Sequence, residues 1–191
     1  MAPINRIEVC GNIASGKTTF AVACGKMGCN IILEDFSSVP FLEDFYGNPD
    51  EFAFETETAF TLLHYYQLKK LGSEPGVCDF SLLDDYAFAL TTLTEREFII
   101  YEKMFDYIIA KIGIPQKIIR LDAPIDVLFN RINKRGRRDE HSISTNYLLR
   151  IQENMNKAYS RKFAAVPILE INTTDTSPSE YDIDFISIIT K

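Results

Sequence analysis

A glycine-rich segment near the start of the chain constrains its fold more than any other feature. Residues 11–18 read Gly-Asn-Ile-Ala-Ser-Gly-Lys-Thr, which matches the phosphate-binding pattern G-x-x-x-x-G-K-[ST]. Glycines at the first and sixth positions permit backbone turns in which successive N–H groups face phosphate oxygens. The pattern needs a strand before the loop and a helix after it, and residues 4–10 and 18–27 can supply them. The segment therefore predicts an α/β fold that binds a nucleoside triphosphate.

Individual side chains of the loop have roles on the donor side of a phosphate transfer. The Lys17 ammonium reaches the β- and γ-phosphates, and the Thr18 hydroxyl is a ligand for Mg²⁺. Asp79 ends an apolar run, so its carboxylate is a second candidate Mg²⁺ ligand, or the N-cap of a helix that starts near Ser81. Asp175 follows the last predicted strand and is a candidate contact for the donor base, although turn chemistry alone also explains it. The residues expected to bind ATP are Gly11, Asn12, Ile13, Ala14, Ser15, Gly16, Lys17, Thr18, Thr19 and Asp175.

Composition and charge restrict the classes of protein that remain. The 191 residues suit a single domain over residues 1–191, and their net charge of −7 disfavours a non-specific nucleic-acid binder. No secretory signal is visible, and no apolar run approaches the ~18 residues that cross a bilayer. The four cysteines form no metal-binding pattern, so we expect buried, reduced thiols. These features indicate a cytoplasmic protein without a nucleic-acid or membrane partner.

Apolar, strand-like runs alternate with helix-like segments along the chain. The predicted strands cover residues 4–10, 30–34, 76–79, 116–121 and 168–171. The predicted helices cover residues 18–27, 50–71, 94–112, 124–134, 145–163 and 178–189, with a further one around Leu83 and Phe88. Thr94 and Glu97 have the spacing of a capping box. This alternation predicts a five-stranded parallel sheet with helices on both faces, whose ligands bind at the carboxyl ends of the strands.

Two further groups supply the remaining needs of phosphoryl transfer. Glu34 ends the second predicted strand and is a candidate general base, with a solvated loop carboxylate as the alternative and Asp35 as a competitor. Arg131 and Arg135 lie four residues apart and share a helix face, and Arg137 follows a glycine that can act as a hinge. Such a segment can close over the γ-phosphate as an arginine-rich lid; a solvated run of charge is the alternative. We therefore expect a P-loop kinase fold.

The same residues resemble the deoxynucleoside kinase family, and the resemblance covers nearly the whole chain. Residues 45–49, Phe-Tyr-Gly-Asn-Pro, resemble the family segment F-Y-x-x-P, whose tyrosine binds the sugar 3′-hydroxyl, so Tyr46 inherits this role. Residues 131–140 match the family lid R-I-x-x-R-G-R-x-x-E, in which arginines grip phosphates and the glutamate, here Glu140, helps bind the 3′-hydroxyl. The resemblance implies a homodimer that uses ATP and Mg²⁺ on a deoxynucleoside, with Glu34 as the catalytic base.

The family resemblance also indicates where the acceptor base binds and where this chain departs from the pattern. Phe54 and Glu57 lie in the aromatic segment that holds the base, with Asp85 near the family's base-contacting acid. Where the family has [DE]-R-S after the third strand, this chain has Asp-Phe-Ser, so Phe80 replaces an arginine beside the catalytic carboxylate and the 5′-hydroxyl. This loss of charge weakens catalysis, changes the acceptor, or is compensated by another cation.

Glu57 is the second departure, because the family commonly has a glutamine there. An ionised glutamate offers only acceptors, which suit the two adjacent donors of guanine, whereas a protonated one mimics glutamine and suits adenine. We therefore expect a purine acceptor, deoxyguanosine or deoxyadenosine. A Glu57 that pairs with His64, or that is solvated, is the alternative.

Two other functions remain open at this stage. A nucleoside monophosphate kinase needs arginines for the acceptor phosphate, and residues 33–79 contain none. A nucleotide-binding regulator with little turnover is suggested by Phe80.

Overall fold

The phosphate loop joins a buried strand to a helix, as its pattern predicts. The computed structural model describes residues 4–36, 39–71, 74–137 and 140–175. Strand β1 (Arg6–Cys10) is buried throughout, and helix α1 (Lys17–Lys26) begins directly after the loop. Gly16 precedes this helix in the left-handed conformation, with φ of 101°. The first turn of α1 therefore faces the loop with its backbone N–H groups, an arrangement that favours anions.

The described residues form a five-stranded sheet in the order β2-β3-β1-β4-β5, and every pair of neighbours is parallel. The prediction of a parallel α/β sheet is thus confirmed. The chain moves to one side of β1 for β2 and β3 and to the other for β4 and β5, so the strand order reverses at β1. Ligands of such sheets bind at this reversal, where the loop begins. The other strands are β2 (Ile31–Ile32), β3 (Gly76–Cys78), β4 (Lys117–Asp122) and β5 (Ile168–Asn172).

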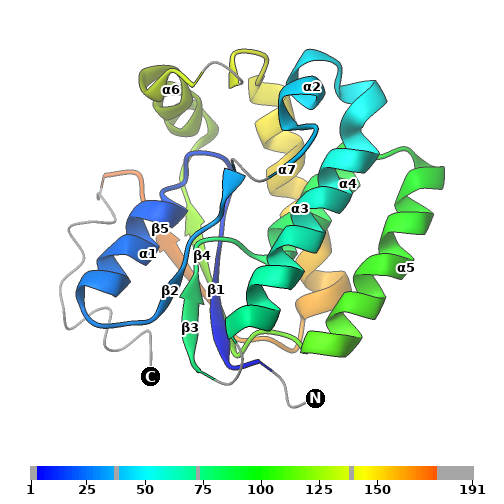
Figure 1. Ribbon diagram of the computed structural model, residues 1–191. Coiled ribbons are helices and arrows are strands. Elements are labelled where there is room, and N and C mark those ends of the chain that lie inside the picture. Colours follow the sequence, from blue (N-terminus) through cyan, green and yellow to red (C-terminus); the bar gives the residue numbers. More distant parts are fainter. Residues whose placement is uncertain (1–3, 37–38, 72–73, 138–139, 176–191) are drawn as a thin grey trace.

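Helices cover both faces of the sheet, as Figure 1 shows. Helix α1 packs on one face, and α4 and α7 pack on the other, with α3 and α5 outside them. The short helix α2 and helix α6 lie beyond the carboxyl ends of the strands. Their bounds are α2 (Leu42–Gly47), α3 (Pro49–Leu71), α4 (Leu82–Thr92), α5 (Glu95–Ile112), α6 (Ile125–Arg135) and α7 (Thr145–Ala158).

The helices differ from their sequence predictions in two places, and one further predicted helix is not described. Helix α2 was not predicted, because six residues are too few to display a helical apolar period. The predicted helix over residues 145–163 ends as an α-helix at Ala158 and continues as a π-helix over Tyr159–Phe163. The predicted helix over residues 178–189 lies outside the described residues. The capping box of α5 is confirmed, since Thr94 and Glu97 each bond the other's backbone N–H.

Helix α4 brings charge into the core. Its Ser81 N-cap accepts a hydrogen bond from the Leu83 N–H, so the cap is Ser81 and the alternative of Asp79 as N-cap is wrong. Leu82 and Leu83 are buried with the carboxylates of Asp84 and Asp85 in the same turn. Two carboxylates therefore lie in the buried first turn of the helix, and that of Asp84 contacts Gly11 directly after β1.

The expectation of buried thiols holds for three of the four cysteines. Cys10, Cys24 and Cys78 are buried, Cys29 is half-buried, and all four thiols are unpaired. In the part of the chain that the structure describes, no helix is both long and apolar enough to cross a membrane.

Candidate active site

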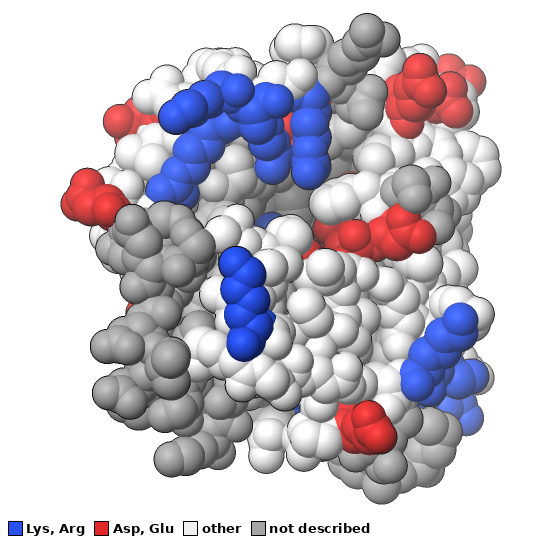
Figure 2. All heavy atoms as spheres, turned by 60° about the vertical axis from the view of Figure 1, so that its left-hand side comes forward, with Lys and Arg blue, Asp and Glu red and all other residues white. Residues whose placement is uncertain are grey.

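A cavity of about 650 Å³ opens at the carboxyl ends of the strands. Figure 2 shows the hollow on this face, with basic side chains gathered along one rim. Of the residues predicted to form the site, those that line the cavity are Ile13, Ala14, Ser15, Gly16, Lys17, Thr18, Thr19, Glu34, Tyr46, Glu57, Asp79, Phe80, Asp85, Arg131, Arg135, Arg137, Glu140 and Asp175. Three predicted residues, Gly11, Asn12 and Phe54, lie outside this lining. The structure thus brings donor and acceptor candidates into one cavity.

The phosphate loop is held by contacts within itself, by a side chain from α4 and by the backbone of α7. Lys17 Nζ donates to the Gly11 carbonyl at 2.5 Å and to the Asn12 carbonyl at 3.3 Å. The Gly11 N–H donates to both carboxylate oxygens of Asp84, at 3.2 and 3.1 Å, and this carboxylate also lies 3.7 Å from Lys17 Nζ. The Asn12 amide donates to the Leu148 carbonyl at 2.8 Å. Gly11 and Asn12 therefore shape the loop from behind rather than line the cavity.

Asp84 is a functional candidate that sequence reasoning missed. Burial raises its pKa to about 7, against the opposing effects of Lys17 and of the Gly11 N–H. Its position three residues after the Ser81 cap, in the first turn of α4, was the available signal. The carboxylate fixes the Lys17 ammonium and the first turn of the loop in one arrangement.

Ser15 supplies an independent sign that the loop has room for a ligand. Its side chain is buried, yet its hydroxyl has no hydrogen-bond partner among the described residues. A buried polar group without a partner is costly, and a phosphate oxygen is an acceptor of the kind that this hydroxyl lacks.

Thr18 and Asp79 meet at the mouth of the loop. The Thr18 hydroxyl is hydrogen-bonded to the Asp79 carboxylate, and the Glu34 N–H donates to Asp79 Oδ1 at 2.5 Å. Burial raises the pKa of Asp79, and both hydrogen bonds oppose that rise. Among the described residues, no group of three or more His, Cys, Asp or Glu side chains forms a metal cage. An adjacent hydroxyl and carboxylate fit Mg²⁺, which takes few protein oxygens and completes its shell with phosphates and water.

Glu34 lies at the end of a chain of buried polar groups. Its Oε1 is 2.9 Å from Nε2 of His64, and Nδ1 of the same ring is 2.9 Å from both carboxylate oxygens of Asp85. The Phe80 ring stacks on the imidazole with centroids 4.0 Å apart and planes 5° apart. Burial lowers the pKa of His64, but the charge and hydrogen bond of Asp85 and the contact with Glu34 outweigh it and raise the pKa to about 10.

His64 is the second functional candidate that the sequence interpretation did not assign to the site. It lies seven residues after Glu57 on α3, a spacing that places both on one helix face. The alternative in which Glu57 pairs with His64 is wrong, because His64 binds Glu34 and Asp85 instead.

Glu57 lines the cavity from helix α3 and is buried. Its Oε1 accepts a hydrogen bond from the Thr92 hydroxyl at 3.0 Å. Burial raises its pKa to about 8, the Thr92 hydrogen bond opposes the rise, and the charge of Asp85 adds to it. Burial therefore favours the neutral acid form of Glu57, which has one donor and one acceptor.

The aromatic part of the cavity differs from the prediction. Phe54 is half-buried and packs against the main core cluster instead of lining the cavity. Its place is taken by other aromatic side chains from α2, α3, α4 and the segment after β2, namely Phe36, Phe45, Phe60 and Phe88. The family resemblance predicts Phe54 as a contact of the base. The rotation of α3 about its own axis decides which aromatic residues of this helix face the cavity.

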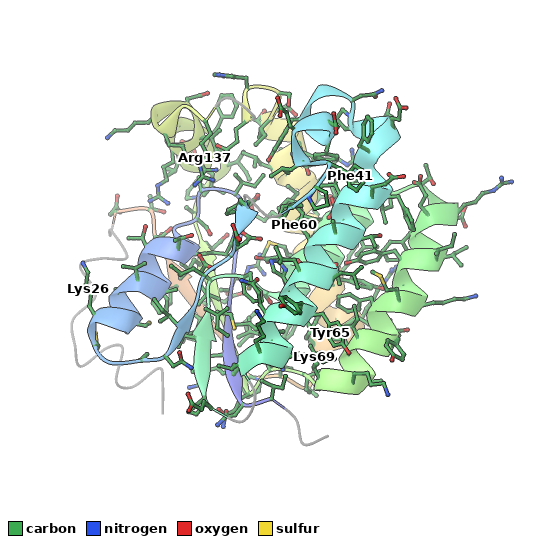
Figure 3. All side chains as sticks on the ribbon, viewed as in Figure 1. Lys26, Phe41, Phe60, Tyr65, Lys69 and Arg137 are labelled. Atoms are coloured by element: carbon green, nitrogen blue, oxygen red, sulfur yellow. The ribbon has the colours of Figure 1, made fainter. Side chains whose placement is uncertain are left out.

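Three arginines reach the cavity from α6 and the segment that follows it. Arg131 donates to the carbonyls of Ala14 and Thr173, so it ties α6 to the phosphate loop and to the residue that follows β5. Arg135 binds Glu140 through two nitrogens, and Arg137 lies 3.7 Å from the same carboxylate. Figure 3 shows Arg137 beside α6, above the position of Phe60 on α3, and both residues line the cavity.

A phosphate loop that faces a buried carboxylate chain across one cavity is the arrangement of a P-loop phosphotransferase. The chain belongs to the deoxynucleoside kinase family, since the model of that family, described as deoxynucleoside kinase, matches residues 7–190. The protein is accordingly a nucleoside kinase, with ATP as the phosphate donor.

Relatives support this membership at the level of sequence and fold. The chain is 30% identical over 187 residues to a deoxyguanosine kinase of Bacillus subtilis (strain 168), a match that covers 94% of this chain and 89% of that protein. It is 27% identical over 177 residues to a deoxyadenosine kinase of Dictyostelium discoideum, over 88% of this chain and 72% of that protein. The solved structure of deoxyadenosine kinase from M. mycoides with bound dCTP has a TM-score of 0.75 at 21% identity and covers 96% of each chain. At that identity the last likeness shows the fold alone.

Proposed function

We propose that the protein transfers the γ-phosphoryl group of ATP to the 5′-hydroxyl of a purine deoxynucleoside. The observation that carries the proposal is the single cavity that joins the phosphate loop to Glu34 and Glu57. Direct transfer requires the acceptor oxygen to lie next to the γ-phosphorus, in line with the bond that breaks. One cavity shared by donor and acceptor supports this arrangement. The names of the relatives, a deoxyguanosine kinase and a deoxyadenosine kinase, support a purine acceptor.

The proposed transfer is a direct displacement. Glu34 takes the proton of the 5′-hydroxyl, and the freed oxygen forms a bond to the γ-phosphorus. The bond from the γ-phosphorus to the β–γ bridging oxygen breaks, and ADP leaves with the 5′-monophosphate as the second product. Lys17, Arg131, Arg135 and Arg137 face the phosphates and stabilise the charge that develops on them.

The sugar is assigned to one residue on α2 and one in the segment after α6. Tyr46 and Glu140 line the same cavity, and we assign the 3′-hydroxyl to them. Glu140 is also bound by Arg135, so a sugar that engages this carboxylate acts on the position of an arginine that faces the phosphates. Binding of the correct acceptor is thereby linked to placement of the lid.

Mg²⁺ is assigned to the Thr18 hydroxyl and the Asp79 carboxylate. Both are oxygen ligands, they lie in contact, and both line the cavity next to the loop. When bound, the ion neutralises charge on the transferring phosphates. The N–H of Glu34 donates to Asp79, so the proposed metal ligand and the proposed base are fixed relative to each other.

The acceptor base is assigned to Glu57. In its neutral form this residue offers a donor and an acceptor, which match N1 and the 6-amino group of adenine. In its ionised form it offers acceptors only, which match N1–H and the 2-amino group of guanine. With a pKa of about 8, the neutral form dominates at pH 7, so we infer that deoxyadenosine is favoured there and deoxyguanosine gains as the pH rises.

A coupled ADP-release assay with ATP and each of the four deoxynucleosides tests the proposal. The expected result at pH 7 is turnover of deoxyadenosine and deoxyguanosine well above that of the two pyrimidines. Glu34→Gln serves as the control, with turnover lowered by about 10³-fold and ATP binding retained. Turnover of pyrimidines alone, or tight ATP binding without turnover of any deoxynucleoside, would refute the proposal.

We further propose that the protein is a homodimer through the outer helices. Helix α5 exposes Ile99, Ile100 and Tyr107, and the neighbouring α3 exposes Leu62 and Tyr66. A second copy of this chain can bury these side chains, as apolar surface removed from water favours association. Light scattering after size exclusion is expected to give twice the mass of 21.8 kDa, and the mass of one chain for Ile100→Lys. A wild-type chain that elutes as a monomer at micromolar concentration would contradict the dimer.

A further inference from the structure

His64 occupies a position in which both of its ring nitrogens face carboxylates. Nε2 lies 2.9 Å from Glu34 Oε1, and Nδ1 lies 2.9 Å from Asp85 Oδ1 and Oδ2. A neutral imidazole has one N–H and one lone pair, so one of these contacts would set a lone pair against carboxylate oxygens. An imidazolium donates to both sides. The geometry therefore favours the doubly protonated, positively charged ring.

The surroundings of the ring agree with a positive charge. The ring is buried, Glu34 faces it from the segment after β2, and Asp85 faces it from α4. The aromatic rings of Phe80 and Phe60 lie at 4.0 and 6.0 Å from the imidazole between centroids, and neither carries charge. Two carboxylates without a cation between them would repel each other at this depth. The resulting pKa of His64, about 10, lies well above neutral pH.

Phe80 stacks on the His64 ring and is also the residue by which the Asp-Phe-Ser segment after β3 departs from the family motif. It follows Asp79 at the position where the family motif resembled by this chain has an arginine. In this structure the position holds a buried aromatic ring that lies parallel to the imidazole. An arginine at the same place would bring a second positive charge against the ring. The apolar residue at position 80 and the histidine on α3 are therefore complementary parts of one arrangement.

We propose that His64 is the positioning residue for Glu34, and that the His64–Phe80 stack supplies the cation which an arginine after the third strand would otherwise supply. The inference rests on the proposed role of Glu34 as the base. His64 holds Oε1 of Glu34, which assigns Oε2 to the proton of the acceptor hydroxyl. Asp85 anchors the ring from the far side, and the parallel Phe80 ring keeps its plane aligned with Glu34.

The charge state of His64 is testable without any activity measurement. The chain contains two histidines, and the second, His141, is exposed. Side-chain ¹⁵N NMR of the whole protein therefore gives two sets of imidazole signals. The set that remains in the His141→Gln variant belongs to His64. We expect both nitrogens of His64 to remain protonated up to pH 8. A His64 that becomes neutral below pH 8 would overturn the inference even if every variant failed to fold.

The positioning role is testable by exchange of the cation between the two positions. His64→Gln is expected to lower kcat about 100-fold with little change in the KM for ATP, because a displaced base costs rate rather than donor binding. Recovery of turnover by a cation placed at position 80 is the response that loss of a merely structural residue does not produce. The double variant His64→Gln with Phe80→Arg is expected to have a kcat at least 10-fold higher than that of His64→Gln alone. Phe80→Arg in the wild-type background is expected to lower kcat. Equal kcat values for wild type and His64→Gln, or no recovery in the double variant, would overturn it.

Glu34→Gln separates this inference from the proposed function. If Glu34→Gln keeps wild-type turnover, the role of Glu34 as base fails. If Glu34→Gln is inactive while His64→Gln has the kcat of the wild type, only the role of His64 fails.

Discussion

Replacing Glu57 by glutamine is expected to stabilise the protein, and the gain depends on pH in a defined way. Burial raises the pKa of Glu57 from its ordinary value of 4.5 to about 8 in the folded chain. Below pH 4.5 the carboxyl is protonated in both the folded and the unfolded chain, so it contributes nothing. Between pH 4.5 and 8 unfolding releases the proton, so stability falls as the pH rises. Above pH 8 the full cost remains, about 5 kcal/mol at 1.36 kcal/mol per pH unit.

Glutamine has the shape of the protonated acid but cannot ionise. The difference in unfolding free energy between Glu57→Gln and wild type should therefore grow by about 4 kcal/mol from pH 5 to pH 9. Urea unfolding at pH 5, 7 and 9, followed by circular dichroism, measures it. Glu55→Gln on the exposed side of the same helix is the matched control and should show no such growth. A difference that is the same at pH 5 and pH 9 would refute the buried, protonated Glu57. The variant should also lose the pH dependence of the preference between adenine and guanine.

Three further substitutions test the loop, the lid and the fold. Gly11→Ala places a Cβ 2.5 Å from the Leu121 carbonyl, so the loop has to shift, and calorimetry should show ATP affinity lowered by at least about 10-fold; unchanged affinity would contradict the close packing of the loop. Arg137→Ala should lower kcat by about 100-fold and change the KM for ATP far less, because its contact is made to developing charge; an equal loss in both would assign the residue to ground-state binding. Thr94→Ala removes the N-cap of α5 and should cost about 1 kcal/mol in urea unfolding, with no loss as the contradicting result.

The main elements of the fold follow from local sequence signals. The phosphate loop implies its own strand and helix, and the capping box of Thr94 marks the start of α5 within one residue. Alternation of apolar runs with amphipathic segments predicts the parallel sheet. Helix α2 escaped prediction because its six residues start after Phe41 in a left-handed conformation rather than at a recognisable cap.

The site was less predictable where side chains meet across distant elements. The positions of Glu34, Arg131, Arg135 and Arg137 around the cavity were predictable, because each lies near the end of a strand or a helix. The partner of Glu34 was not, since His64 lies 30 residues away on a helix whose rotation is decided by packing. Asp84 escaped for the same reason, as its contact with Gly11 joins residues 73 positions apart. Phe54 illustrates the converse, a motif residue that packing turns towards the core.

The contacts of Arg131 with Ala14 and Thr173 divide the arginine-bearing segment into two mechanical parts. Arg131 is hydrogen-bonded to the phosphate loop and to the residue after β5, whereas Arg137 follows Gly136, where α6 ends in a left-handed conformation with φ of 60°. An inhibitor that engages the loop and Arg131 meets a surface already organised, so it spends little affinity on ordering the protein. A compound extended to Arg137 has to hold a separate segment in place as well.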